Sequence, residues 1–328
     1  MAEQQPHEIV WTLSTSAVAA RCLQVVADLG VADRIEEQPV PVTDLAGSCR
    51  ADRDALDRVL RLLAAHGVFE YQAGAYSHTQ SSRLLRDDHP MSMRAFVSMM
   101  GLPAMLDGIN ALEHAVRTGA PAIETFEPRG FWAYLQAHPD QAQVFGRAMT
   151  AKAGADIGAV LATYDFSLVH RIVNVGGGRG HLLRAVLDSV PTAEGVLFDL
   201  PEVVSSFELD QQRLTIAAGD FFADPLPTAD LYVLMEVIHD WDDAAAVSIL
   251  TAARRAATTG AKLLIIENVL DERPDDRGQT LDIIMLTITG GRERTAGELD
   301  ALLRRAGWRP GAVIDTPGPL RIAEAQAS

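Results

Sequence analysis

One histidine in the sequence stands among acidic residues in a way that suits acid–base chemistry. His239 lies in the segment MEVIHDWDD (235–243), just after an apolar run of the kind that forms a buried strand, and Glu267 ends the next such run. If these strands are neighbours in a parallel sheet, their carboxyl ends place His239 and Glu267 side by side. A carboxylate on the far imidazole nitrogen would fix the tautomer, so that the ring can take the proton of a phenol, whose pKa is about 10 like that of Tyr.

The same acidic segment allows a second interpretation, a metal site. His239, Asp240, Asp242 and Asp243 are all possible ligands. Asp242 and Asp243 are better explained as the start of a helix, since Asp is favoured as the N-cap. The two cysteines of the chain show no zinc-binding spacing. We therefore expect no metal.

A glycine-rich loop follows the first apolar run of the second half. In NVGGGRGH (174–181) the glycines Gly176, Gly178 and Gly180 repeat at every second position. The dinucleotide pattern G-x-G-x-x-G fails, because its last glycine would fall on His181. Glycine lets the backbone come close to a ligand. The observed spacing suits S-adenosyl-L-methionine, which carries no phosphate.

Two aspartates follow the next two apolar runs. Asp199 ends the second run, where a carboxylate can accept both hydroxyls of a ribose. Asp220 follows the third run in GDFF (219–222) and could accept a hydrogen bond from the amino group of adenine, with Phe221 packed on the ring. The alternative is that each aspartate only shapes a turn or caps a helix.

Five short apolar runs follow residue 164, and helical stretches such as Gly180–Val190 and Asp242–Thr258 separate them. The runs are Arg171–Val175, Gly195–Leu200, Leu214–Ala218, Asp230–Met235 and Lys262–Val269. This alternation predicts an α/β fold, a parallel sheet with helices on both faces. Ligands of such sheets bind at the carboxyl ends of the strands, where the glycine loop, the aspartates and His239 all stand.

The first part of the chain has the pattern of two helices followed by a β-hairpin. Apolar residues at helical spacing predict helices over Leu13–Leu29 and Asp54–His66, and two short extended pieces, Val68–Tyr71 and Ala75–His78, follow. This is the outline of a winged helix, used either for DNA binding or as a dimerisation scaffold. Arginines and aspartates alternate over residues 50–61, and the formal net charge is −16. We therefore expect no nucleic acid partner.

Residues 90–164 keep a helical pattern and are rich in methionine and phenylalanine. Met is a flexible gap-filler that suits both cores and pockets for flat ligands. The residues concerned are Met91, Met93, Met99, Met100, Met105, Met149, Phe96, Phe126, Phe131 and Phe145.

Composition favours a cytoplasmic protein. Two cysteines in 328 residues are too few for disulfide bonds to stabilise the whole chain. The first ten residues are polar and predict no signal peptide, and we expect no stretch to approach the roughly 20 apolar residues that a membrane helix needs. We expect no membrane partner.

Four motifs occur in order: VGGGRG (175–180), GDFF (219–222), HDWDD (239–243) and GGRERT (290–295). Together they resemble those of the plant-type small-molecule O-methyltransferases and their bacterial relatives in natural-product biosynthesis. The resemblance covers essentially the whole chain. It implies a Rossmann-like class I methyltransferase sheet over residues 165–328, a helical region that forms the substrate pocket over 91–164, and a helical, winged-helix-like dimerisation domain over 1–90. It also implies an intertwined homodimer in which each amino-terminal region closes part of the partner's pocket.

The resemblance also implies roles for individual residues. His239 becomes the catalytic base, with Glu267 and Glu293 on either side. The residues implied to hold S-adenosylmethionine are Gly176, Gly178, Gly180, Asp199, Leu200, Asp220, Phe221 and Met235. Those implied to contact a small aromatic acceptor are Phe145, Met149, Met285, Thr289 and Asp240.

Two positions depart from the family. Asn174 stands where an acid is usual, and it adds no negative charge for the ammonium group of the donor; Met235 stands where plant members carry a lysine. Two other functions compete with O-methylation. One is hydroxylation or decarboxylation by a relative that still binds the donor, but such relatives tend to have lost the histidine. The other is a regulator that binds DNA through the winged-helix region, which the acidic balance disfavours.

Overall fold

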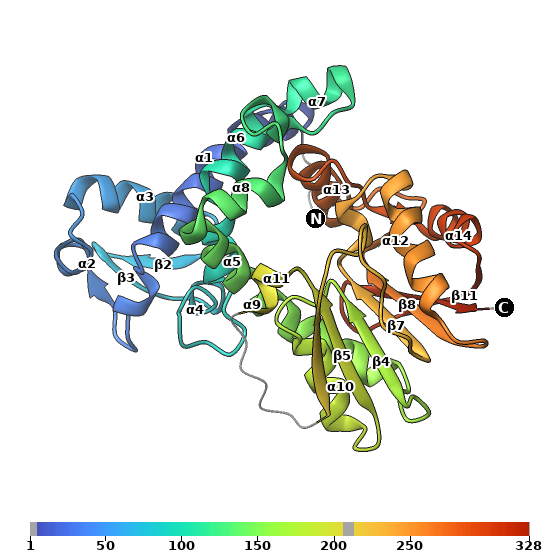
Figure 1. The fold of residues 1–328 in the computed structure, drawn as a ribbon. Coiled ribbons are helices and arrows are strands. Elements are labelled where there is room, and N and C mark those ends of the chain that lie inside the picture. Colours follow the sequence, from blue (N-terminus) through green and yellow to red (C-terminus); the bar gives the residue numbers. More distant parts are fainter. Residues whose placement is uncertain (1–4, 206–212, 328) are drawn as a thin grey trace. The chain divides into compact units, whose positions relative to one another are not determined.

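A computed structural model describes residues 5–205 and 213–327 of the chain (Figure 1). Contacts divide the chain into two compact units. Unit 1 comprises residues 1–106 and 135–152, and unit 2 comprises residues 107–134 and 153–328. The domain boundaries expected from the sequence, at residues 90 and 164, stay a prediction.

Unit 1 contains the helices and the small sheet of the amino-terminal region. The elements to residue 100 are α1 (Pro6–Asp28), η1 (Ala32–Arg34), β1 (Val40–Pro41), α2 (Val42–Cys49), α3 (Arg53–Ala65), β2 (Phe69–Gln72), β3 (Ala75–His78), α4 (Gln80–Arg83) and α5 (Arg94–Met100). Asp52 caps α3 by accepting a hydrogen bond from Ala55 N. The strands pair antiparallel in the order β1-β3-β2, so the expected helix, helix, hairpin outline is present.

The middle of the chain is helical, as predicted, and contributes to both units. Its elements are α6 (Pro103–Asn110), α7 (Leu112–Thr118), η2 (Ala122–Thr125), α8 (Phe131–Ala137) and α9 (Pro139–Thr163). The first part of α9, to residue 152, belongs to unit 1 and the rest to unit 2.

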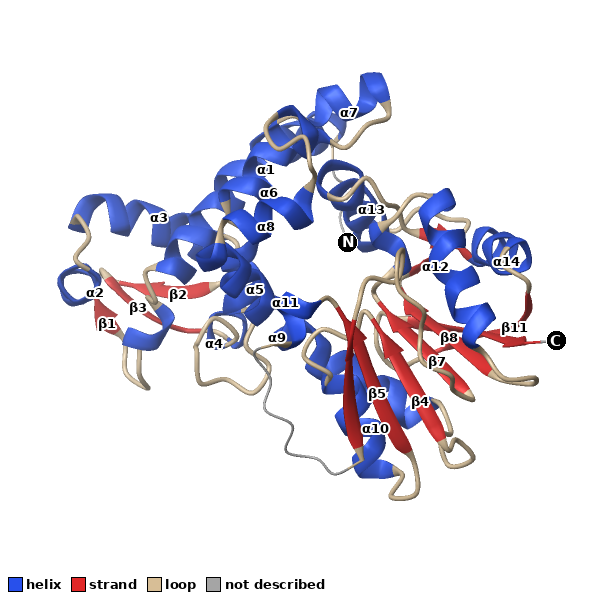
Figure 2. Cartoon of the chain, in the orientation of Figure 1, coloured by secondary structure: helices blue, strands red, loops and turns tan. Residues whose placement is uncertain are grey.

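Unit 2 is built on a seven-stranded sheet in the order β11-β12-β8-β7-β4-β5-β6 (Figure 2). Its strands are β4 (Arg171–Val175), β5 (Glu194–Asp199), β6 (Leu214–Ala218), β7 (Leu231–Met235), β8 (Lys262–Glu267), β11 (Trp308–Asp315) and β12 (Arg321–Ala327). The five predicted runs form the parallel part, while β11 and β12 add antiparallel strands at one edge. The expected class I methyltransferase sheet is thereby confirmed.

Helices cover both faces of this sheet. The helical elements of unit 2 after β4 are α10 (His181–Ser189), α11 (Pro201–Val204), η3 (Ile238–Asp240), α12 (Asp243–Ala256), α13 (Asp276–Ile288) and α14 (Ala296–Arg305). One buried cluster joins α12 and α14 to Val173 and Leu234, and the other joins α9 and α10 to Ile172 and Val233. Successive strand residues therefore point into opposite cores, as strand geometry requires. Short pieces β9 (Val269–Leu270) and β10 (Arg294–Thr295) pair parallel beside the sheet.

One expectation about the amino-terminal region needs correction. Helix α1 is 23 residues long and apolar enough to cross a membrane, so the expectation that no segment reaches that length is wrong. This statement concerns the length and composition of α1 alone, and core helices of soluble proteins and signal sequences have the same length and composition. The cytoplasmic location stays a prediction.

Candidate active site

The glycine loop and the turn that carries His239 leave adjacent strands of the sheet. Strand β4 pairs parallel with β7, so both segments start at the same edge. They also touch, because a Cβ atom on Gly176 would lie 2.9 Å from Val237 Cγ2. The backbone of Glu236, just before this contact, takes the left-handed value φ = 54°. Such conformations cost about 1–3 kcal/mol outside glycine and concentrate at functional sites.

The glycine loop is braced from the next strand. Gly176, Gly178 and Gly180 all have positive φ, and a Cβ on Gly178 would meet no atom within 4 Å. Asp199, at the end of β5, accepts hydrogen bonds from Gly178 N at 2.7 Å and from Leu200 N at 2.8 Å. Burial raises the pKa of Asp199, although these two donors oppose the shift. Asp199 therefore shapes the loop, and any contact with a ribose would be additional.

Asp220 likewise takes part in a turn, since its Oδ1 accepts a hydrogen bond from Phe222 N at 2.8 Å. Phe221 packs its edge against Trp241, with ring centroids 5.8 Å apart at 88°. The turn interpretation is thus correct for Asp220. A role toward adenine stays a prediction for Asp220 and Phe221.

His239 is held by a different acid from the one expected. The imidazole is buried, and its Nδ1 lies 2.9 Å from Glu293 Oε1. Glu267, which ends β8 beside β7, accepts hydrogen bonds from the backbone N–H groups of Ile238 and His239 at 2.6 and 3.1 Å. Glu267 thus fixes the backbone of the turn, and the expectation that its carboxylate orients the imidazole is wrong. With the Glu293 carboxylate accepting from Nδ1–H, the deprotonated ring carries its lone pair on Nε2.

Three carboxylates set the charge of this imidazole. Burial alone would lower the pKa of His239. The hydrogen bond with Glu293 and the negative charges of Asp240 and Glu267 outweigh burial and raise the pKa to about 10. Burial, with the charge of Glu293 as a further cause, raises the pKa of Glu267 to about 7. A base of this strength matches the acidity of a phenol.

The segment Gly290–Thr295, which we call the strap, encloses the His239 turn. A Cβ on Gly291 would lie 1.9 Å from His239 O, so the two backbones are in contact. Arg292 N donates to His239 O at 2.8 Å, and Glu293 N donates to Asp282 Oδ1 of α13 at 2.9 Å. The sequence motif GGRERT marked this segment, but it did not reveal the roles of Gly291, Asp282 or the buried Arg294.

The expected acceptor residues lie in both units. Phe145 and Met149 belong to α9 within unit 1, whereas Met285, Thr289 and Asp240 belong to unit 2. The Thr289 hydroxyl donates to Met285 O and accepts from Gly291 N, so it already serves the turn after α13. Asp240 Oδ1 lies 3.9 Å from His239 Nε2. Acceptor contact by these five residues stays a prediction.

The two departures from the family lie at strand ends beside the glycine loop. Met235 ends β7, and Asn174 is the last residue but one of β4. Asn174 is 3% exposed, and its Oδ1 has no hydrogen-bond partner in the described structure. A Cβ on Gly177 would lie 2.5 Å from Asn174 Nδ2, so the amide lies directly under the loop. The strand end beside the glycine loop therefore offers a neutral hydrogen-bond acceptor, the amide oxygen of Asn174, rather than a carboxylate. Among residues 5–205 and 213–327, no group of three or more His, Cys, Asp or Glu side chains could hold a metal ion.

Comparison with known proteins identifies two regions. Residues 109–309 match the profile of the O-methyltransferase domain, and residues 11–88 match that of the O-methyltransferase dimerisation domain. The chain is 36% identical to the phenazine O-methyltransferase PhzM of Lysobacter antibioticus, over 97% of this chain and 95% of that protein. It is 34% identical to the mitomycin biosynthesis 6-O-methyltransferase of Streptomyces lavendulae, over 97% and 94% of the two chains.

A solved structure gives the same result. The fold matches that of NcsB1, an O-methyltransferase from neocarzinostatin biosynthesis in complex with S-adenosylmethionine and 2-hydroxy-5-methyl naphthoic acid, with a TM-score of 0.82. The two chains share 35% identity over 94% of this chain and 96% of NcsB1. The chain belongs to the S-adenosylmethionine-dependent O-methyltransferases of natural-product biosynthesis, with an amino-terminal dimerisation domain.

Proposed function

We propose that the protein methylates a hydroxyl oxygen of a small aromatic molecule, with His239 as the general base. The observation that carries this proposal is the buried imidazole whose Nδ1 lies 2.9 Å from Glu293, in a turn that contacts the glycine loop. S-adenosylmethionine, when bound, supplies an electrophilic methyl carbon on a sulfonium. We assign the binding of this molecule to the glycine loop, where a Cβ on Gly178 would meet no atom within 4 Å, together with Asp199 and the unpaired Oδ1 of Asn174.

His239 Nε2 has the free lone pair that can accept the hydroxyl proton of the acceptor. Glu293 holds the ring on the opposite nitrogen and stabilises the imidazolium that results. Positioned proton transfer of this kind contributes about 10²–10⁴-fold to a rate. Turnover of a panel of phenols and naphthols with a methyl-labelled donor tests the function, because the label must appear on oxygen.

The names of the relatives support an aromatic acceptor. They include a phenazine O-methyltransferase, a 3-amino-4-hydroxybenzoate 4-O-methyltransferase and NcsB1 with its bound naphthoic acid. Hydroxylation or decarboxylation is not favoured, since these relatives are named as O-methyltransferases. Consumption of donor without a methylated product would support that alternative instead.

The pKa of His239 predicts how the rate depends on pH. Only the deprotonated imidazole can accept a proton, and a pKa of about 10 leaves little of it in that form at neutral pH. We therefore expect kcat/KM for a phenol to rise from neutral pH toward pH 10 rather than to level off near the ordinary histidine value. Initial rates across this range, with protein stability monitored in parallel, measure the profile. A plateau above pH 7 would contradict the raised pKa.

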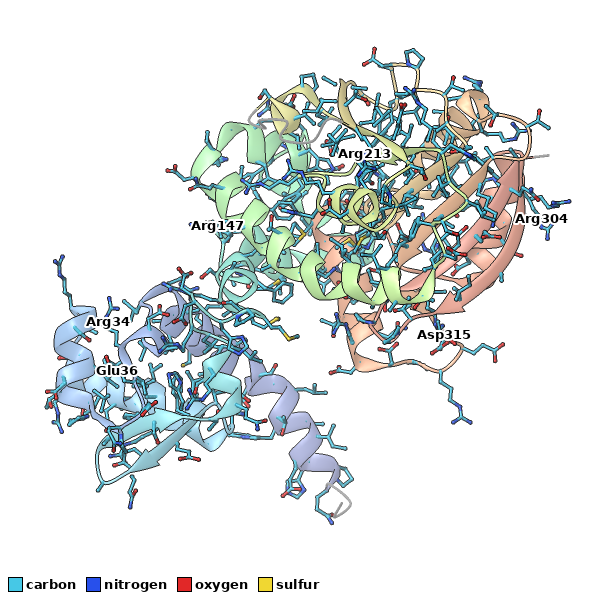
Figure 3. The ribbon with its side chains drawn as sticks, turned by 90° about the horizontal axis from the view of Figure 1, so that it is seen from below. Arg34, Glu36, Arg147, Arg213, Arg304 and Asp315 are labelled. Carbon is cyan, nitrogen blue, oxygen red and sulfur yellow. The ribbon has the colours of Figure 1, made fainter. Side chains whose placement is uncertain are left out.

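Asp199 is expected to govern donor affinity. Asp199→Ala removes the acceptor that braces Gly178 N and Leu200 N, and the buried donors left unpaired cost about 1–3 kcal/mol. We expect S-adenosylhomocysteine to bind about 5–150-fold more weakly, as measured by calorimetry. Asp315→Asn is the matched control, since this exposed aspartate lies at the end of β11 (Figure 3). Equal affinities in Asp199→Ala and the wild type would contradict the proposed role.

We also propose a homodimer built on α1 and its neighbours. The dimerisation profile begins at residue 11, and the apolar surface of α1 is exposed. Its exposed apolar residues are Ile9, Val10, Trp11, Leu13 and Val18. Exposed patches of this kind mark interaction sites, and a second copy of the chain fits the dimerisation profile. Light scattering of the wild type and of Trp11→Glu would measure the association directly.

A further inference from the structure

The turn that carries His239 is too short to hold its own shape. It is a three-residue 3₁₀ helix, η3, whose geometry is less stable than that of an α-helix and whose backbone hydrogen bonds are long, from Asp240 N to Val237 O at 3.3 Å and from Trp241 N to Ile238 O at 3.2 Å. Glu236, two residues before η3, has a strained, left-handed backbone. The direction of the imidazole therefore depends on groups outside the turn.

Arg294 supplies the largest set of these outside contacts. Its guanidinium donates to Ile238 O at 3.1 Å and to Trp241 O at 2.8 Å, so it binds the carbonyl groups on both sides of His239. It also donates twice to Asp243 Oδ1, at 2.9 and 3.0 Å, at the first residue of α12. One planar fork thus connects the turn to the helix that follows it.

The burial of Arg294 shows that this is not a surface ion pair. Its side chain is 1% exposed, whereas that of Asp243 is 48% exposed. Charged residues are almost never buried so completely unless they are paired, and guanidinium is retained where several directed hydrogen bonds are needed. The adjacent Glu293 contacts the imidazole itself, so two consecutive residues of the strap fix the ring and its backbone.

We propose that Arg294 is a positioning residue of the methyl-transfer site, which sets the direction of the His239 imidazole by holding the backbone of its turn. The proposal rests on the proposed function of His239. Arg294 touches the turn through backbone carbonyls, so it acts on the reaction through His239.

The charges around the imidazole make this role measurable. The groups that act on His239 are the carboxylates of Glu293, Asp240 and Glu267. Arg294 in turn lowers the pKa of Glu267, although burial and the charges of His239 and Glu293 act on that pKa more strongly. A turn that loosens would lengthen the contact between the imidazole and Glu293, and the pKa of His239 would then fall toward its ordinary value.

The test uses Arg294→Lys, which keeps the positive charge but loses the planar guanidinium and its directed hydrogen bonds. In protein labelled with ¹³C at histidine Cε1, the signal lost in His239→Ala identifies His239, and its titration gives the pKa. We expect a lower pKa of His239 in Arg294→Lys than in the wild type. With S-adenosylmethionine and 1,4-dihydroxy-2-naphthoic acid as probe, we expect kcat to fall by about 10–100-fold. Binding of S-adenosylhomocysteine confirms that the variant is folded.

Arg304→Gln serves as the control, because this exposed arginine of α14 lies on the outside of unit 2 (Figure 3). A double-mutant comparison then isolates the route of the effect. Arg294→Lys should change the residual rate of His239→Ala little, because the group it positions is already gone. An equal loss in both backgrounds, or a folded Arg294→Lys whose His239 titration and turnover match the wild type, overturns the inference. Full activity of His239→Ala would refute the proposed base instead, and a shifted titration would still show that Arg294 positions the ring.

Discussion

Replacing His239 with alanine is expected to lower kcat by about 10²–10⁴-fold, the range of positioned proton transfer. The loss should appear in kcat, while donor affinity stays unchanged, because the imidazole contacts Glu293 rather than the groups proposed to bind the donor. Single-turnover methylation of a phenol and calorimetric titration with S-adenosylhomocysteine measure the two quantities separately. The deficit should shrink above about pH 10, where most of the acceptor is ionised and needs no base.

His170→Ala is the matched control for this experiment. His170 is 86% exposed on its side chain and pairs with Asp230 at 3.3 Å, at the end of the sheet where β4 begins. We expect its removal to leave kcat unchanged. If His239→Ala kept wild-type turnover with intact donor binding, the assignment of His239 as the base would be wrong.

Replacing Gly291 with alanine should have an effect of comparable size for a steric reason. The added Cβ would meet His239 O at 1.9 Å and Asp240 C at 2.4 Å, and both are backbone atoms that cannot rotate away. The strap must then move off the turn, which breaks the hydrogen bond from Arg292 N to His239 O. A displacement of about 1 Å at a catalytic group can cost about 10²-fold in rate. We expect a loss of kcat of at least this size together with a lower Tm.

Gly297→Ala provides the control for the glycine substitution itself. Gly297 lies in α14, and a Cβ there would meet no atom within 4 Å. Alanine in a helix is more stable than glycine by about 0.5–1 kcal/mol, so this variant should be slightly more stable and fully active. Equal behaviour of Gly291→Ala and Gly297→Ala would show that the strap tolerates displacement.

Much of the fold was predictable because apolar periodicity reports burial directly. The predicted runs Arg171–Val175 and Leu214–Ala218 are the strands β4 and β6, residue for residue. The antiparallel strands were not predicted. β11 contains Pro310 and Gly311, which are poor strand residues, and the structure accommodates them at a break in pairing between Pro310 and Val313.

The site was predictable only in part, since strand ends can be located from sequence but contacts between distant loops cannot. Glu267 lies where its strand end places it, yet its carboxylate serves the backbone. Glu293 reaches the imidazole from a segment 54 residues beyond His239, and no periodicity relates the two. Arg294 is a buried charge, whereas a sequence alone suggests that an arginine is exposed.

The adjacency of β4 and β7 has a practical consequence for protein engineering. Neighbouring strands lie about 4.8 Å apart, a spacing fixed by their hydrogen bonds. The distance between the glycine loop and the His239 turn is therefore fixed by the pairing of Asn174 with Val233, and it does not depend on the sequence of either loop. Segments around α13 can be exchanged without resetting that distance. A slip of one residue between the two strands would separate donor and base, even with every side chain in both loops retained.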